Sequence, residues 1–151
     1  MIQISQKSQY ALRAVYELAR RREAGGPDRP VTATDIADAQ AVPPKFLELI
    51  LAELARAGVI ESRRGPRGGY RLVRDPAELA VGTVLELIEG PMHLVTCETG
   101  EAAPCSMRGD CAFVELWNRA EAALAGVFDT TTFADLVKAE QEKSDVPNFS
   151  I

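Results

Sequence analysis

Three cysteines are the only ones in the chain, and they fall within fifteen consecutive residues: Cys97, Cys105 and Cys111. The segment that carries them, LVTCETGEAAPCSMRGDCAF, is rich in glycine, proline and alanine, as loops are. Thiolates are nucleophiles and soft metal ligands, whereas cysteines that only fill space tend to be scattered through a core. The clustering therefore indicates a loop whose cysteines perform chemistry.

The spacing C-x7-C-x5-C narrows the kind of chemistry that this loop can perform. An odd number of cysteines fits a disulfide framework poorly, and structural zinc sites usually pair their ligands as C-x2-C. Wide, irregular gaps suit an iron-sulfur cluster, because its ligands must reach different corners of a bulky group. The spacing favours a cluster, and it leaves zinc, free or redox-switching thiols, and three inert buried cysteines as alternatives.

The composition predicts a single domain in the cytoplasm. The chain has 151 residues, of which 46% are hydrophobic, and this is enough for one core with an appended helix. Its N-terminus, MIQISQKSQYALRAV, lacks the apolar stretch of a secretion signal, and no segment is long and apolar enough to span a membrane. We therefore expect a cytoplasmic protein without a membrane partner.

Charge is divided unevenly between the two halves of the chain. The net charge of -5 argues by itself against a nucleic-acid partner. However, residues 1–75 hold thirteen Lys and Arg against nine Asp and Glu, whereas residues 76–151 hold four against thirteen. A basic first half can face phosphates while the acidic half faces elsewhere, so the distribution is compatible with DNA binding.

The first half predicts three helices. An apolar stripe with helical spacing marks the first, over residues 8–22. Thr32 begins a capping-box-like motif for a short second helix. Pro43 and Pro44 suit the first turn of a third helix, which Gly58 ends. A short helix, a tight turn and a longer helix are the helix-turn-helix arrangement.

A basic hairpin is predicted directly after these helices. Residues 59–63 and 70–73 are short strand-like runs, and the turn between them is rich in glycine, which allows close backbone approach. Residues 63–74 contain five arginines and no acid. Such a hairpin can act as a wing that reaches the phosphate backbone or the minor groove. The alternative is a solvated hairpin whose arginines serve solubility.

The expected DNA contacts come from the third helix and the wing. Lys45 near the helix start can meet the backbone, and Glu48 can accept a hydrogen bond from cytosine N4, unless it is only a surface charge. The full set of predicted contacts is Pro43, Lys45, Glu48, Arg63, Arg64, Gly65, Arg67, Gly68, Gly69 and Tyr70.

The second half predicts a dimer interface. A helix over residues 81–89 precedes the cysteine loop, and a longer helix runs from about Cys111 to Phe128. An apolar stripe of this kind lies more often in a core than in an interface. Because the other elements are short, we interpret it as the helix through which two copies pair to span two half-sites. The stripe consists of Phe113, Leu116, Trp117, Ala120, Leu124 and Val127.

These elements predict a mainly α protein with a small β-hairpin wing. We expect residues 1–80 to form a winged helix-turn-helix domain, residues 81–142 to form the cysteine loop and dimerisation helices, and residues 143–151 to form a poorly ordered tail. No Gly-rich phosphate loop, nucleophile motif or histidine beside a suitable Ser or Cys is present in the sequence. We therefore expect that the protein is not an enzyme.

Four stretches of the chain resemble one family of winged-helix regulators. SQKSQYALRAVYELA, RRGPRGGYRL, VGTVLELIEG and the C-x7-C-x5-C loop are similar to the opening helix, wing, following helix and sensing loop of the Rrf-type family that includes IscR, NsrR and RirA. The resemblance covers roughly residues 1–135. It implies a homodimeric bacterial repressor that binds a double-stranded operator under control of an iron-sulfur cluster, and that senses iron or cluster status, redox or nitric oxide.

The ligands of that cluster differ from the family pattern. Iron-sulfur regulators of this family place a histidine shortly after the third cysteine, whereas this chain has Ala112, Phe113 and Val114 there. The resemblance therefore implies a 4Fe-4S rather than a 2Fe-2S cluster, bound by the three cysteines and a fourth ligand. His93 and Asp110 are candidates for this ligand, as are other loop acids, water or a small thiol.

Two further positions depart from the family. The nitric-oxide sensors can take a cluster ligand from an aspartate of the first helix, and this chain has Ser8 in that region. Glu48 matches the family's base-reading glutamate, whereas Leu49 stands where the iron-sulfur regulator has a glutamine. The operator sequence is therefore expected to differ.

Overall fold

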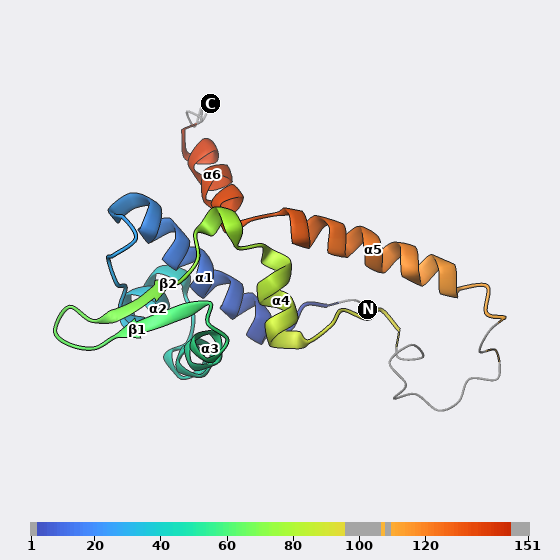
Figure 1. Ribbon diagram of the computed structural model, residues 1–151, viewed down its shortest axis with the longest axis horizontal. Helices are drawn as coiled ribbons and strands as arrows, with labels where there is room; N and C mark the ends of the chain where they lie inside the picture. Colours follow the sequence, from blue (N-terminus) through green and yellow to red (C-terminus); the bar gives the residue numbers. More distant parts are fainter. Residues whose placement is uncertain (1–2, 96–106, 108–109, 146–151) are drawn as a thin grey trace, which may run out of the picture.

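The computed structural model describes residues 3–95, 107 and 110–145. It is mainly helical, with one two-stranded antiparallel sheet (Figure 1), as the sequence predicts. The elements in chain order are α1 (Gln6–Gly25), α2 (Ala33–Gln40), α3 (Pro44–Arg56), β1 (Ile60–Arg63), β2 (Gly69–Leu72), the 3-10 helix η1 (Pro76–Glu78), α4 (Val81–Glu89), α5 (Val114–Thr130) and α6 (Phe133–Ser144).

Helix α1 lies at the centre of the core. Its N-cap is Ser5, whose hydroxyl accepts a hydrogen bond from the Ser8 amide at 3.1 Å. The helix packs against α2, α3, α4, α6 and β2. Small side chains on its buried faces allow these neighbours to approach closely. The buried apolar residues of α1 are Ala11, Ala14, Val15, Leu18 and Ala19.

Helices α2 and α3 form the predicted helix-turn-helix. Thr32 caps α2 by accepting a hydrogen bond from the Asp35 amide at 3.1 Å. The chain turns through Ala41, which has a left-handed φ of 50°, and α3 starts at Pro44, where a missing amide hydrogen costs nothing. One face of α3 enters the core through Leu47, Ile50, Leu51 and Leu54.

The hairpin has the register in which Ile60 pairs with Leu72 and Arg63 with Gly69. Tyr70 also exchanges two backbone hydrogen bonds of 2.8 Å with Val31, so the segment before α2 lies along the hairpin. This close approach requires a glycine. A Cβ at Gly69, whose φ is +150°, would stand 2.5 Å from the Val31 carbonyl oxygen.

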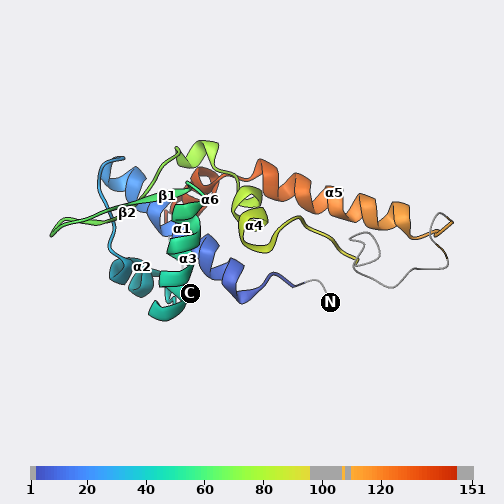
Figure 2. The same cartoon turned by 60° about the horizontal axis from the view of Figure 1, so that its bottom comes forward.

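Helix α5 extends away from the remaining elements. Figures 1 and 2 show the hairpin at one end of the molecule and α5 reaching toward the other. The C-terminal end of α5, its root, is held by two backbone hydrogen bonds. The Val81 amide donates to the Thr131 carbonyl at 2.9 Å, and the Phe133 amide donates to the Leu79 carbonyl at 3.0 Å. These bonds tie the start of α4 to the junction between α5 and α6.

Helix α6 returns to the core. Thr132 and Asp135 form a reciprocal capping box at its start. Phe133 and Val137 are fully buried, and the helix packs against α1. The sequence placed these residues in a second unit, residues 81–142. The structure buries them together with the helix-turn-helix, while the division at residue 80 stays a prediction.

Several boundaries differ from the sequence analysis by a few residues. Helix α1 spans Gln6–Gly25 rather than residues 8–22, and α5 ends at Thr130 rather than at Phe128. Helix α5 begins at Val114 rather than at about Cys111, because the preceding residues form a turn in which the Val114 amide donates to the Cys111 carbonyl at 3.3 Å. Helix α6 continues to Ser144 and so includes the first residues assigned to the tail, whose residues 146–151 lie outside the described part. Among the described residues, no helix is both long and apolar enough to cross a membrane.

Candidate nucleic-acid interface and sensing loop

The outer face of α3 carries the predicted DNA contacts of the helix-turn-helix. Pro43 is its exposed N-cap, and Lys45 and Glu48 are exposed on the first two turns. Two apolar side chains share the outer surface, Phe46 with 58% and Leu49 with 66% of its surface accessible to solvent. The face is therefore a mixture of charged and apolar groups, which is the composition needed to read both base edges and methyl groups.

A buried carboxylate fastens the helix-turn-helix to α1. Glu17 is completely buried, and it accepts hydrogen bonds from Arg20 at 2.8 Å, Arg21 at 2.7 Å and the Gln40 side chain at 2.9 Å. Burial alone raises the pKa of the Glu17 carboxyl, but these hydrogen bonds outweigh it and lower the pKa below its ordinary value. Since Gln40 ends α2, the charged group fixes the turn between α2 and α3.

Three of the five arginines of the wing have no acidic partner within the described residues: Arg64, Arg67 and Arg74. Arg64 and Arg67 are exposed at the tip, and no carboxylate within the described residues lies within 4.0 Å of either. Arg71 differs, because it pairs with both Asp28 and Glu61. Arg63, one of the predicted DNA contacts, also has Asp28 as a partner, at 3.9 Å. The positive charge of the wing is therefore partly neutralised, at Arg63 and Arg71, by acids outside residues 63–74.

The other predicted wing contacts have local structural roles. Gly65 has a φ of +110°, and a Cβ at Gly68 would press on the carbonyl oxygens of Arg63 and Gly65. Gly69 lies against Val31, as described above. Tyr70 is half-buried and packs against the core. The backbone of the wing thus depends on these glycines, and its exposed chemistry comes from arginine.

Removing the two arginines at the tip of the wing is expected to weaken the salt dependence of operator binding. Each of Arg64→Ala and Arg67→Ala should lower the slope of log affinity against log salt by about one unit, because each deletes one phosphate contact. Titrations of an operator duplex at several salt concentrations measure this slope. Arg119→Ala, on α5 at the opposite end of the molecule, is the matched control and should leave it unchanged. An unchanged slope in both wing variants would contradict the assignment.

The described part of the cysteine loop contains one of its three thiols. Cys97 and Cys105 lie outside the described residues, whereas Cys111 is half-buried, carries a free thiol and stands just before α5. His93 and Asp110, the candidate fourth ligands, are both exposed. Within the described residues, no group of three His, Cys, Asp or Glu side chains is arranged to hold a metal ion.

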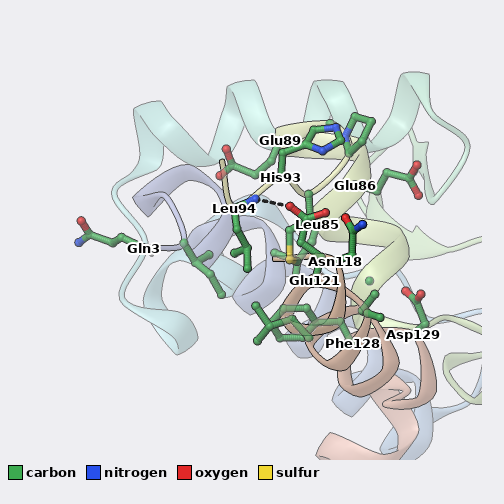
Figure 3. Close-up of a pocket in the computed structure, with 18 residues that line it drawn as sticks. Gln3, Leu85, Glu86, Glu89, His93, Leu94, Asn118, Glu121, Phe128 and Asp129 are labelled. Carbon is green, nitrogen blue, oxygen red and sulfur yellow. Dashed lines mark hydrogen bonds between the residues drawn. The ribbon is translucent and has the colours of Figure 1, made fainter. Parts of the chain in front are cut away.

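Residues 89–94 lead from α4 into the cysteine loop and are called its stem. A cavity of about 880 Å³ opens beside this stem (Figure 3). Its walls are α4, α5 and residues 90–94, and His93 lies at its edge. The Leu94 amide donates a hydrogen bond to Glu121 of α5 at 2.6 Å. The chain that leads into the cysteine loop is therefore attached to α5 before the first cysteine.

The stem of the loop also contacts the N-terminus of α1. Glu89, the last residue of α4, accepts a hydrogen bond of 2.6 Å from the buried Ser8 hydroxyl. Hydrogen bonds from Ser5 and Ser8 lower the pKa of the Glu89 carboxyl. One residue away, Lys7 pairs with Glu53 of α3 at 2.8 Å. The first turn of α1 thus contacts both the loop stem and α3. These two contacts could not be predicted from the sequence, because the partners are distant along the chain.

The apolar stripe of α5 lies on the surface. None of the residues of α5, all of which the structure describes, is buried. Phe113, Leu116 and Val127 are 59%, 50% and 59% exposed, and the rings of Phe113 and Trp117 stack at 6.2 Å. Trp117, Ala120 and Leu124 are half-buried, and Leu124 lines the cavity against α4. The stripe is therefore available to another molecule over most of its length.

The chain is similar to known transcriptional regulators. Over 145 residues it is 31% identical to the HTH-type transcriptional regulator IscR of Escherichia coli O1:K1 / APEC. The matched residues make up 96% of this chain and 85% of the relative. The structure of CymR (YrzC), the global cysteine regulator of B. subtilis, matches with a TM-score of 0.75 and 30% identity, over 92% of this chain and 98% of that one.

Two further structures extend this likeness. T. potens IscR matches with a TM-score of 0.73 and 28% identity, over 94% of this chain and 90% of that one. The oxidized form of Staphylococcus aureus CymR matches with a TM-score of 0.68 and 29% identity, over 90% and 96%. The family model Rrf2, described as an iron-dependent transcriptional regulator, matches residues 4–139. The chain therefore belongs to the Rrf2 family of winged-helix transcriptional regulators, as its wing and cysteine loop predict.

Proposed function

We propose that this Rrf2-family regulator is a repressor whose affinity for its operator is controlled by an iron-sulfur cluster on the cysteine loop. The observation that carries the proposal is the donor set, three cysteines within fifteen residues in a chain that contains no others. The iron-dependent description of the family supports it.

The residues present fit such a group. Cys97, Cys105 and Cys111 would hold it through thiolates, with His93 or Asp110 as candidates for the fourth position of a 4Fe-4S cluster. Both candidates are exposed and so can rotate toward a ligand without leaving a core. When bound, an iron-sulfur cluster supplies a redox-active group whose assembly depends on iron and whose open position can react with oxygen or nitric oxide.

The contacts around the loop stem explain how ligation can influence DNA binding. Thiolate ligation would attach Cys97, Cys105 and Cys111 to a single group, within the segment of the chain that connects the stem at Leu94 to α5. The stem contacts α1 through Glu89 and Ser8, and the same turn of α1 holds α3 through Lys7 and Glu53. A shift of the stem would therefore be transmitted to the recognition helix over two contacts.

The proposed DNA complex is that of a symmetric dimer. Two copies would pair along the exposed stripe of α5, so that each α3 enters a major groove of a pseudo-palindromic operator. The wing tips at Arg64 and Arg67 would then lie on the flanking backbone or minor groove. The exposure of both surfaces in the described residues supports this arrangement.

A thiol switch is the second candidate function. Two of the structural relatives are CymR proteins, one of them described as a global cysteine regulator and one solved in an oxidized form. In this alternative, two of the three cysteines form a disulfide under oxidation and no cluster is bound. Because both functions use the same residues, only the chemistry of the isolated protein separates them.

Anaerobic purification followed by iron and sulfide analysis tests the proposal. The wild-type protein is expected to be brown and to contain iron and sulfide at about four each per protomer. Cys111→Ala should lose both and still fold, because the side chain lies outside the core. His93→Ala should have a smaller effect, and Ser106→Ala, which alters the loop without removing a thiol, is the matched control.

Three outcomes would contradict the proposal that a cluster controls operator binding. A colourless protein that contains zinc would make the loop a zinc site. A protein without metal that forms a disulfide and changes its operator affinity on oxidation would establish the thiol switch. Operator affinity that is identical with and without the cluster would remove it from regulation, even if it binds.

A further inference from the structure

Leu49 is the most exposed of the large apolar side chains in the described part of the chain, at 66% of its surface. It lies on α3, and at 100° per residue it points away from the buried face of that helix. Lys45 and Ala52 are exposed beside it on neighbouring turns, as is Glu48. A leucine side chain that faces water in this way adds little to the stability of the folded monomer.

Its neighbour Phe46 differs in having an intramolecular partner. The rings of Phe46 and Tyr10 are 6.1 Å apart, so Phe46 leans toward α1. Glu53, on the same side of α3, pairs with Lys7 of α1. At 100° per residue, Leu49 lies about 60° around α3 from Phe46 and about 40° from Lys45, on the side opposite the buried residues. A molecule that binds this side of α3 would therefore contact Leu49.

The chemistry of the major groove defines what Leu49 can recognise. Base edges there offer hydrogen-bond donors and acceptors, which a leucine cannot use, and one apolar group, the C5 methyl of thymine. Contact with that methyl removes apolar surface from water on both partners. We propose that Leu49 is a specificity-determining residue that selects thymine by contact with its methyl group, a role that rests on the proposed operator binding.

The surroundings of Leu49 favour DNA over a protein partner. Lys45 lies one turn before it and Arg56 two turns after it on the exposed side of α3, and both can reach phosphates that flank a groove. The arginines of the wing tip add positive charge on the hairpin that follows the same helix in the chain. A polyanion complements this surface better than an apolar protein groove would.

Thymine-to-uracil substitution in the operator tests the proposal, because it removes only the methyl group. The operator is first selected from random duplexes with the wild-type protein, and each thymine of a half-site is then replaced in turn. One replacement is expected to weaken wild-type binding about fourfold per half-site, the effect of one buried methyl-sized group. Leu49→Ala should bind the thymine and uracil duplexes equally.

A conservative variant separates this role from general damage to α3. Leu49→Met keeps an apolar side chain of similar volume, so it should retain the thymine preference. Since Leu49 is largely exposed, the midpoint temperature of thermal unfolding should change little in either variant.

Several results would overturn the proposal. One is a full thymine preference in Leu49→Ala, and another is a wild-type protein indifferent to every uracil replacement. Unchanged operator binding by Leu49→Ala, together with loss of a protein partner, would assign the residue to that partner instead. Wild-type protein that binds no duplex would refute operator binding itself, which is distinguishable because no thymine comparison could then be made.

Discussion

Replacing Phe133 with alanine is expected to lower the free energy of unfolding by about 3–5 kcal/mol. Phe133 is among the largest side chains that are fully buried in the described residues, and it opens α6 at the junction with α5. Its amide donates to the Leu79 carbonyl, so the surrounding backbone is fixed and cannot close around the missing ring. Urea denaturation followed by circular dichroism measures the loss as a shift in midpoint.

A second phenylalanine supplies the control for this change. Phe46 is 58% exposed, so Phe46→Ala removes the same atoms from a site that is mostly in water. Its cost should be about 1 kcal/mol or less, from its contact with Tyr10. Equal losses in the two variants would show that α6 is not part of the core in solution.

Replacing Leu116 with glutamate is expected to convert the protein to a monomer and to reduce operator affinity by about 100-fold or more. Leu116 is half-exposed on the side of α5 that faces away from the cavity, so the folded chain can accommodate a carboxylate there. In the proposed dimer, symmetry would bury two such charges without partners. Sedimentation gives the oligomeric state, and titration of the operator gives the affinity.

The choice of Leu116 follows from the structure of α5. Leu124, on the same stripe, lines the cavity against α4, so a charge there would also disturb the monomer. Arg119→Glu introduces the same carboxylate at an exposed position of α5 that is not part of the stripe, and is the matched control. It should remain a dimer. If Leu116→Glu remains an operator-binding dimer too, the interface does not include this stripe.

Local signals explain which parts of the fold could be predicted. The sequence predicts α4 with the bounds observed, residues 81–89, because its apolar spacing ends at a glycine and proline pair. Pro44 similarly marks the start of α3, and Thr132 caps the final helix as expected. Each of these signals acts within about one turn of the chain, so no knowledge of the tertiary fold is needed to read it.

Contacts between distant residues could not be predicted in the same way. Glu17 stands in a polar helical run that resembles a solvated face, yet it is buried because Gln40 approaches from another helix. Arg71 belongs to a basic run, and its charge is neutralised by Asp28, which is 43 residues away. The pairing of charges is a property of the folded chain, and sequence spacing carries little information about it.

The same distinction applies to the candidate site. The cysteine spacing, the wing and the apolar stripe are visible in the sequence because each is a local pattern of residue types. The connection between them is not local. In the sequence, Ser8 is notable only because it cannot supply the cluster ligand that an aspartate supplies in some relatives. In the structure, its hydroxyl donates a hydrogen bond to Glu89 of the loop stem.

The backbone bridge at the root of α5 bears on how such regulators can change during evolution. Ala80 and Thr132 pair directly, so the chain that leaves the core after η1 returns to the same place. The direction of α5 is thus set where it joins the core, and insertions between Leu94 and Phe113 leave these contacts in place. Doubling a connecting loop costs only about 0.6 kcal/mol in closure entropy. New spacings between the cysteines, and with them sensitivity to new signals, can therefore be acquired while the helix-turn-helix and the wing stay unchanged.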